Sequence, residues 1–543
     1  QAFFQLFGHW LVTLFQPFET KFIQIFPGSI SFRNIKFWQF GDTKLNLYMT
    51  PLCNLVRILQ SLCSIRKKPL HFLRRFYIIL PAIIAHSVFI GQFLTCLKAQ
   101  QYIMRLRILC QCIMNVIGRN QFDSCFAVHL EQLLIYILLA VTFGYTMIMA
   151  ETALGRMTRK SPVGAFAASG KGRWRAFGGW INAVIPILIV PYYSVIGGWV
   201  IKYLVGYITG HGSELAQDGY FSSFIANGVS VEIVFLLFTL LTLGIIFAGV
   251  RNGVERVSRM MMPVLVVLSV IIAAYSVTRP GALEGVKYFL VPNPANFSWM
   301  TVVTAMGQMF YSLSIAMGIL VTFGSYMKKD VSIEGSTKNV EIFDTLIAMM
   351  AGLMIIPAVF SFSGGDPDTL QAGPALMFIT IPKVFESMEL GSLVGVLFFV
   401  LVLFAAVTSS IALTESAVST FEDELGWSRK KAAAVIGIIM VLLGSLSALG
   451  YGPLSGVTVI GMQFLDFFDF LTNSVMMPIA AIATCLLVTS VIGVEKIEEE
   501  VTRNGQPFRR KKVFNFMIRT LCPVFAAIIL VSSVANALGW ISM

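Results

Sequence analysis

Two polar segments interrupt long apolar stretches of the chain, and both carry residues that could bind a ligand or an ion. The first, residues 307–318, places Tyr311, Ser312 and Ser314 between apolar neighbours and ends in a glycine. Transporters bind substrates and ions where a membrane helix breaks, since only protein or water can satisfy the freed backbone groups there. The alternative is an unbroken helix whose small residues pack against its neighbours, and this segment alone favours neither interpretation.

The second polar segment is a run of three hydroxyl residues, Thr408, Ser409 and Ser410, within a long apolar stretch. Hydroxyl and carbonyl oxygens are suitable ligands for a small hard cation. The simpler alternative is that each hydroxyl bonds the carbonyl group one turn earlier on its own helix. Taken alone, the pattern favours this alternative.

Several acidic residues also fall within apolar stretches: Glu151, Asp344, Glu415, Asp466 and Asp469. An ionisable group inside a membrane is costly, so each of them is a functional candidate. The competing interpretation is that some of them lie at the membrane interface and are hydrated. We favour function for Asp344 and Asp469, because both occupy motif positions described below.

The composition indicates which elements must position these residues. Of 543 residues, 56% are hydrophobic and 13% are charged, and the mean hydropathy is +0.78. Soluble domains carry about 25% charged residues, so the chain is not a soluble protein, and an apolar run of about 18 residues spans a bilayer. We predict ten spans, at 133–154, 176–207, 230–249, 259–277, 299–326, 341–363, 391–421, 431–450, 455–492 and 514–540.

Lysine and arginine gather in alternate loops between these spans. The loops after the first, third, fifth, seventh and ninth spans are basic, whereas the intervening loops are acidic or neutral. Basic loops are retained in the cytoplasm, so both Leu133 and Met543 are predicted on the outer side. The span at 133–154 would then run from the outer to the inner side, which usually requires an earlier span to carry the N-terminus across the membrane. The best candidate for this earlier span is 76–97.

Residues 1–132 differ in composition from the rest of the chain. They hold fourteen Lys and Arg and four acidic residues, which leaves only +2 of the net charge of +12 for the remainder. The charge therefore does not indicate a nucleic-acid-binding protein. Six of the eight cysteines also lie there, but Cys110 and Cys112 have no second pair at the spacing of a zinc site. We expect a boundary near residue 132.

An ordered set of motifs begins after this boundary. The motifs are Gly144 to Glu151 followed by Gly155-Arg156, then Pro191-Tyr192-Tyr193, Gly307-Gln308 through Ser314, Thr408-Ser409-Ser410, Glu422-Asp423-Glu424-Leu425 and Asp466-Phe467-Phe468-Asp469-Phe470. Together they resemble the neurotransmitter:sodium symporter family, most closely its eleven-helix bacterial amino-acid transporters. The resemblance covers residues 133–543, which would be family helices two to eleven. It implies an all-α integral membrane protein of the plasma membrane, built from two inverted five-helix repeats.

The resemblance also implies a substrate site where the first and sixth family helices unwind. By position, Tyr193 matches the tyrosine that contacts the substrate carboxylate, and Tyr311 matches the aromatic lid. The other substrate-site positions are Ile189, Ser312, Ser314, Met317, Ser409 and Leu413. Methionine is an adaptable side chain, and Met317 stands where some members have phenylalanine, so we expect a roomy pocket for an apolar or aromatic amino acid.

Two sodium sites and a chloride-site equivalent follow from the same resemblance. Ser312 and Asp344 match the first sodium site, and the Ala405 carbonyl, Thr408 and Ser409 match the second. The chloride-site equivalents are Tyr136, Gln308, Ser312 and Asp344. Because the Asp344 carboxylate would itself supply a negative charge there, we predict that chloride is not required. Asp469 matches the acidic half of an outer gate.

The first family helix is not recognisable in residues 1–132. A glycine-rich break, an asparagine ligand and an Arg-Phe-Pro run are expected, whereas the nearest polar string, Gly118 to Phe122, has a different order. We expect residues 1–132 to be non-family sequence joined at a frameshift, a mispredicted start or a degraded gene. About half of the substrate and sodium ligands would then be missing, and this chain would be impaired.

The sequence therefore predicts a sodium-coupled symporter of amino acids or related small amines that works by alternating access. The alternative from another class is a transport-inactive membrane protein that serves as a binding or regulatory subunit. An enzyme is not predicted, because no nucleophile and base are paired and His211 is the only histidine after residue 132. Proton-coupled permeases share the general architecture, but Thr408 and Ser409 favour sodium.

Overall fold

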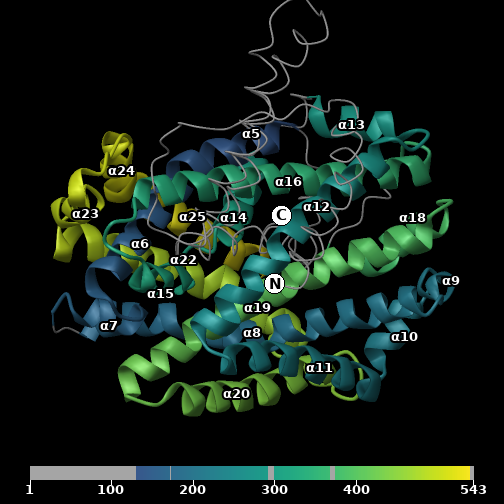
Figure 1. The fold of residues 1–543 in the computed structure, drawn as a ribbon, viewed down its shortest axis with the longest axis horizontal. Helices are drawn as coiled ribbons and strands as arrows, with labels where there is room; N and C mark the ends of the chain where they lie inside the picture. Colours follow the sequence, from purple (N-terminus) through teal and green to yellow (C-terminus); the bar gives the residue numbers. More distant parts are fainter. Residues whose placement is uncertain (1–129, 171–172, 292–298, 367–372, 538–543) are drawn as a thin grey trace, which may run out of the picture. The chain divides into compact units, whose positions relative to one another are not determined.

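The computed structural model describes residues 130–170, 173–291, 299–366 and 373–537, and these segments are helical apart from loops and one isolated bridge between Val459 and Met462 (Figure 1). All of them belong to one structural unit, Phe89–Met543. The predicted span at 76–97 and the boundary near residue 132 concern residues that lie wholly or mostly outside the described part.

Within the described residues, nine helices are long and apolar enough to cross a membrane, and each corresponds to one predicted span. They are α5 (Leu130–Leu139) continuing through η2 (Ala140–Gly144) into α6 (Tyr145–Thr158); α8 (Arg173–Ile208); α11 (Gly228–Phe247); η3 (Val250–Val254) with α12 (Glu255–Val277); α16 (Ile333–Ser363); α19 (Gly391–Leu425); α20 (Arg429–Leu449); α21 (Phe464–Asp469) with η7 (Phe470–Met476), α22 (Met477–Leu486) and η8 (Leu487–Ile492); and α24 (Lys511–Phe516) with η10 (Met517–Leu521) and α25 (Cys522–Ala537).

The remaining predicted span, the fifth at 299–326, is broken into two half-helices. They are α14 (Trp299–Ser312) and α15 (Ile319–Tyr326), and turns at 313–318 separate them. The predicted interruption is thus confirmed, and the alternative of one continuous helix is wrong.

Short helices occupy the connections between the spans. They are α7 (Pro162–Ala167), α9 (Gly212–Leu215), α10 (Tyr220–Ala226), α13 (Ala282–Leu290), α17 (Gly373–Ala375), η6 (Leu376–Thr380), α18 (Ile381–Glu386), α23 (Val494–Val501) and η9 (Arg503–Gly505). Hydropathy alone does not predict such helices, because they are too short and too polar to span a bilayer.

Three span boundaries differ clearly from the prediction. The fourth span begins at Val250 rather than 259, and the other two differences have local reasons. Helix α16 begins at Ile333 rather than 341, because the Ser332 hydroxyl accepts a hydrogen bond from the Gly335 amide at 3.1 Å and caps the helix. Asp344 therefore lies three turns inside α16 and not near its start. The ninth span begins at Phe464 rather than 455, because the preceding loop turns through Ile460 and Gly461, both with positive φ. Asp466 and Asp469 consequently lie in the first turns of that span.

The half-helix α15 packs closely along α6 (Figure 1). Gly155 of α6 lies against the Val321 carbonyl of α15, and Gly324 of α15 lies against the backbone of Thr152. A side chain at either glycine would collide with backbone atoms, so the contact depends on residues that lack one. Helix α8 packs extensively against α19, and these two helices carry the residues predicted on either side of the break.

Candidate functional site

The break between α14 and α15 has an unusual backbone. Ser314, Ala316 and Gly318 have φ angles of +54°, +58° and +68°. Residues with a side chain seldom adopt this left-handed conformation, and such residues cluster at functional sites. A side chain at Gly318 would lie 2.7 Å from the Asn182 carbonyl and from Pro162, which explains the glycine. The break is therefore a fixed feature packed against α8 and α7.

Glu151 of α6 stabilises this break through a hydrogen bond to its backbone. Its carboxylate accepts a hydrogen bond from the Ala316 amide at 2.8 Å, and its side chain is fully buried. The carboxylate thus satisfies one of the backbone groups that the unwound helix leaves open. The sequence marked Glu151 only as an acidic residue in an apolar helix, and its spacing from residue 316 could not show this contact.

We predict that Ala316→Gly is neutral or stabilising. Glycine relieves a left-handed alanine, which costs about 1–2 kcal/mol, but it gives the unfolded chain more freedom, worth about 0.4–1 kcal/mol. The matched change Ala412→Gly, in the regular helix α19, should destabilise by about 1 kcal/mol. Thermal unfolding midpoints in detergent measure the effects of both substitutions. A lower midpoint for Ala316→Gly than for the parent chain would contradict the proposed backbone strain at Ala316.

A buried polar cluster lies where α14 ends. Ser312 donates to the Asp344 carboxylate at 2.8 Å, Tyr136 of α5 donates to the other oxygen of the same carboxylate, and the two hydroxyl oxygens lie 3.0 Å apart. Ser312 and Asp344 are fully buried. Gln308 is half-buried one turn before Ser312. The structure thus joins three of the four predicted chloride-site equivalents by hydrogen bonds, from helices that are far apart in sequence.

Helix α19 carries the three consecutive hydroxyls, and each has a different environment. Thr408 donates to the carbonyl groups of Phe404 and Ala405 on its own helix, at 2.9 and 3.0 Å. Ser410 lies 3.1 Å from the Thr242 hydroxyl of α11. Ser409 is fully buried, and its hydroxyl has no hydrogen-bond partner among the described residues. The simpler alternative therefore describes Thr408 but not Ser409.

The remaining predicted substrate-site residues are buried on the same elements. Ile189 and Tyr193 lie one turn apart on α8, and Ser409 and Leu413 lie one turn apart on α19. Tyr311 ends α14, and Met317 lies within the break. The Ser314 hydroxyl, like that of Ser409, is buried without a hydrogen-bond partner in the described part of the chain. Buried hydroxyls are normally hydrogen-bonded, so both of these hydroxyls have capacity left for a ligand.

The predicted gate residue Asp469 lies on α21, next to Tyr192 of α8. Tyr192 donates to its carboxylate at 3.1 Å, and Asn473 donates to the same oxygen at 2.6 Å. The neighbouring Asp466 accepts from Tyr451 at 3.0 Å. Burial, together with the charge of Asp466, raises the pKa of the Tyr451 hydroxyl, so it stays a donor at neutral pH. Sequence motifs indicated Asp469 but not its link to Tyr192.

Comparisons with known proteins agree with this arrangement. Residues 221–539 match the sodium:neurotransmitter symporter family. The chain is 34% identical over 403 residues to the sodium-dependent transporter YhdH of Bacillus subtilis, which covers 73% of this chain and 88% of the relative. It is 29% identical over 416 residues to a sodium-dependent transporter of Haemophilus influenzae, and this match covers 74% of this chain and 89% of the relative.

A solved structure resembles the fold as well. The crystal structure of MhsT in complex with L-phenylalanine matches with a TM-score of 0.70 and 32% identity, over 79% of this chain and 98% of MhsT. The span pattern, the broken helix and these relatives point to the same conclusion. The chain belongs to the sodium:neurotransmitter symporter family, whose members are membrane transporters and not enzymes.

Proposed function

We propose that the chain binds an amino acid together with sodium at the break between α14 and α15, and carries both across the membrane by alternating access. The observation that carries this proposal is the interrupted helix at 313–318 with two unpartnered buried hydroxyls, Ser314 and Ser409, on the elements beside it. Unwound helices in transporters offer backbone groups to charged ligands.

The substrate in this proposal is an apolar or aromatic amino acid. The crystal structure of MhsT holds L-phenylalanine, and Ile189, Met317 and Leu413 are apolar residues buried on the elements around the break. Tyr193 would contact the substrate carboxylate, and Tyr311 would cover it. Asp469, held by Tyr192 and Asn473, would form part of the outer gate.

Sodium would occupy two sites in this proposal. Ser409 and the Ala405 carbonyl would hold one ion together with Thr408, whose hydroxyl keeps lone pairs after donating to its own helix. Ser312 and Asp344 would hold the other. These oxygen donors suit a small hard cation.

Sodium-induced stabilisation tests this proposal. The Tm of the purified chain should rise with sodium but not with potassium at equal ionic strength, because a ligand that binds only the folded state stabilises it. Ser409→Ala should remove most of this rise. The matched variant Ser410→Ala, whose hydroxyl contacts Thr242 instead, should keep it. An equal response of the two variants would contradict the assignment of Ser409.

We predict that chloride has no effect on sodium-dependent amino-acid binding. The Asp344 carboxylate already places a negative charge beside Ser312 and Tyr136, where chloride-dependent members hold the anion. Replacing chloride by gluconate should leave the affinity for radiolabelled L-phenylalanine within about twofold, since 1.4 kcal/mol corresponds to tenfold. A clear stimulation by chloride would contradict the role of Asp344.

We also propose that this chain is impaired relative to its relatives, since residues 1–132 contain no recognisable first helix of the family. The alternative function, a transport-inactive binding or regulatory protein, rests on the same observation. It would be favoured if the chain were stably expressed yet showed no sodium-dependent ligand binding.

A further inference from the structure

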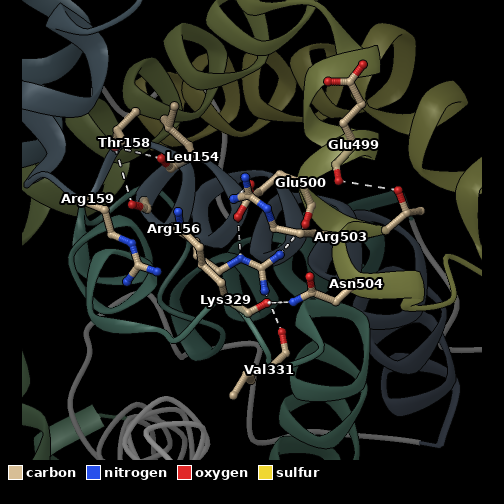
Figure 2. Close-up of polar contacts among 12 residues, drawn as sticks. Leu154, Arg156, Thr158, Arg159, Lys329, Val331, Glu499, Glu500, Arg503 and Asn504 are labelled. Atoms are coloured by element: carbon tan, nitrogen blue, oxygen red, sulfur yellow. Dashed lines mark hydrogen bonds and ion pairs between the residues drawn. The ribbon is translucent and has the colours of Figure 1, made fainter.

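Arg156 is a buried cation at the end of α6 and is none of the proposed ligands. Its side chain has 0% exposure. It donates through Nε to the Glu500 carboxylate at 2.6 Å and through Nη1 to the Val331 carbonyl at 2.6 Å, and Nη2 donates to the Glu500 carbonyl (Figure 2). One guanidinium therefore joins three segments that the sequence separates by up to 344 residues.

The partner carboxylate is also buried, with 6% exposure, and its second oxygen accepts from Arg503 at 2.9 Å. Arg503 is exposed at 41%. Removing one partner of a buried ion pair leaves the other charge without compensation, whereas an exposed pair contributes little. Arg156 is therefore the cation on which this contact depends, and Arg503 is a natural comparison for it.

The segment that follows α15 is held from both sides. Arg156 binds it at Val331, and Asn504 donates to the Lys329 carbonyl at 3.0 Å (Figure 2). Within α15 itself, the Ser325 carbonyl accepts a hydrogen bond from Arg159 at 3.0 Å. These bonds go to backbone carbonyls, so they fix the path of the chain rather than one side chain. The inner half of the broken helix is thus fastened to α6 and to residues 500–504.

The connection between η8 and α24 makes further contacts with the same group of helices. The Glu334 carboxylate of α16 accepts from the Arg509 amide at 2.9 Å and from Tyr145 of α6 at 3.0 Å. Arg510 pairs with Glu341 of α16 at 3.0 Å. Residues 494–510 therefore contact α6 and α16 through buried or half-buried groups, and Asn504 contacts the loop that follows α15.

We propose that Arg156 is a positioning residue that locks residues 494–510 to the inner half-helix α15, so that α6, α15 and α23 move as one body during transport. The joint movement of these helices rests on the proposed transport function, whereas the contact made by Arg156 does not. The lock follows from a buried charge that donates to three acceptor groups on two other segments, which cannot separate without exposing the ion pair.

Spin-label distances test the lock in the full chain with its eight cysteines replaced. Labels at Lys328 and Glu499, both exposed, report on the end of α15 and on α23. The parent chain and Arg503→Gln should give the same narrow distance distribution, and Arg156→Gln should broaden it at least twofold. If Arg156→Gln does not fold, Glu500→Gln removes the same ion pair with the same expected broadening. An unchanged width in the folded variant would overturn the proposal.

A second pair of labels, at Lys328 and Lys430 of α20, separates the lock from the movement. Sodium should shift the Lys328–Lys430 distance while the Lys328–Glu499 distance stays constant. A sodium-induced shift of both distances would overturn movement as one body. If neither distance responded to sodium, the proposed function would be contradicted, and the broadening in Arg156→Gln would still decide whether the lock exists.

Discussion

Gly324→Ala is expected to cause a large loss of stability. The new Cβ would overlap the Thr152 carbonyl and lie 3.0 Å from the Thr152 Cα, and these backbone atoms cannot rotate away. Helices α6 and α15 would have to separate. This separation would also move the Val321 carbonyl away from Gly155 and weaken the packing of α6 against the broken helix. We expect a cost of about 3 kcal/mol, the upper part of the range for overpacking.

The thermal unfolding midpoint and the yield of monodisperse protein measure this effect. Gly244→Ala is the matched control, because Gly244 of α11 has no atom within 4 Å of an added Cβ and alanine favours the helix by about 1 kcal/mol. The control should be neutral or stabilised. Similar midpoints for the two variants would mean that α6 and α15 are not in contact as described.

Asp344→Ala is expected to abolish sodium-dependent binding. It leaves the Ser312 and Tyr136 hydroxyls without their buried acceptor, and each unsatisfied group costs about 1–3 kcal/mol. It also removes the negative charge proposed to face sodium. If removing that charge costs about 3 kcal/mol of sodium-binding free energy, the affinity for sodium falls at least about 100-fold.

Asp344→Asn separates the two effects, because the amide keeps an acceptor oxygen for one hydroxyl but carries no charge. We expect it to fold better than Asp344→Ala and still lose most of the sodium response. Asp330→Ala, an exposed acid in the loop after α15, should behave like the parent chain. Sodium titrations of the unfolding midpoint decide the question, and an intact response in Asp344→Asn would refute the role of the charge.

The membrane spans and the break could be predicted because each leaves a local pattern. A long apolar run is sufficient to indicate a span, and the hydroxyl and glycine residues of 307–318 indicate where the run cannot continue as a helix. Motif order then indicated Ser312, Asp344 and Ser409. The resemblance placed Tyr136 near Ser312 and Asp344, and the hydrogen bonds among them agree with it.

Contacts between distant segments could not be predicted in the same way. Glu151 reaches the Ala316 amide across 165 residues, and Arg156 reaches Glu500 across 344. Gly155-Arg156 belongs to one of the family motifs, but the motif does not indicate that Arg156 is buried or where its partners lie. Different roles of neighbouring hydroxyls were also hidden, because Ser409 and Ser410 differ only in which helix each one faces.

Accumulation of radiolabelled L-phenylalanine in proteoliposomes tests the central claim most directly. The parent chain should be compared with a chimera in which a family first helix replaces residues 1–132. The proposed mechanism predicts that an inward sodium gradient drives accumulation by the chimera, that the parent chain accumulates less, and that collapsing the gradient stops both. Accumulation by the chimera without a sodium gradient, or sodium-dependent binding without accumulation, would contradict sodium-coupled symport at this site.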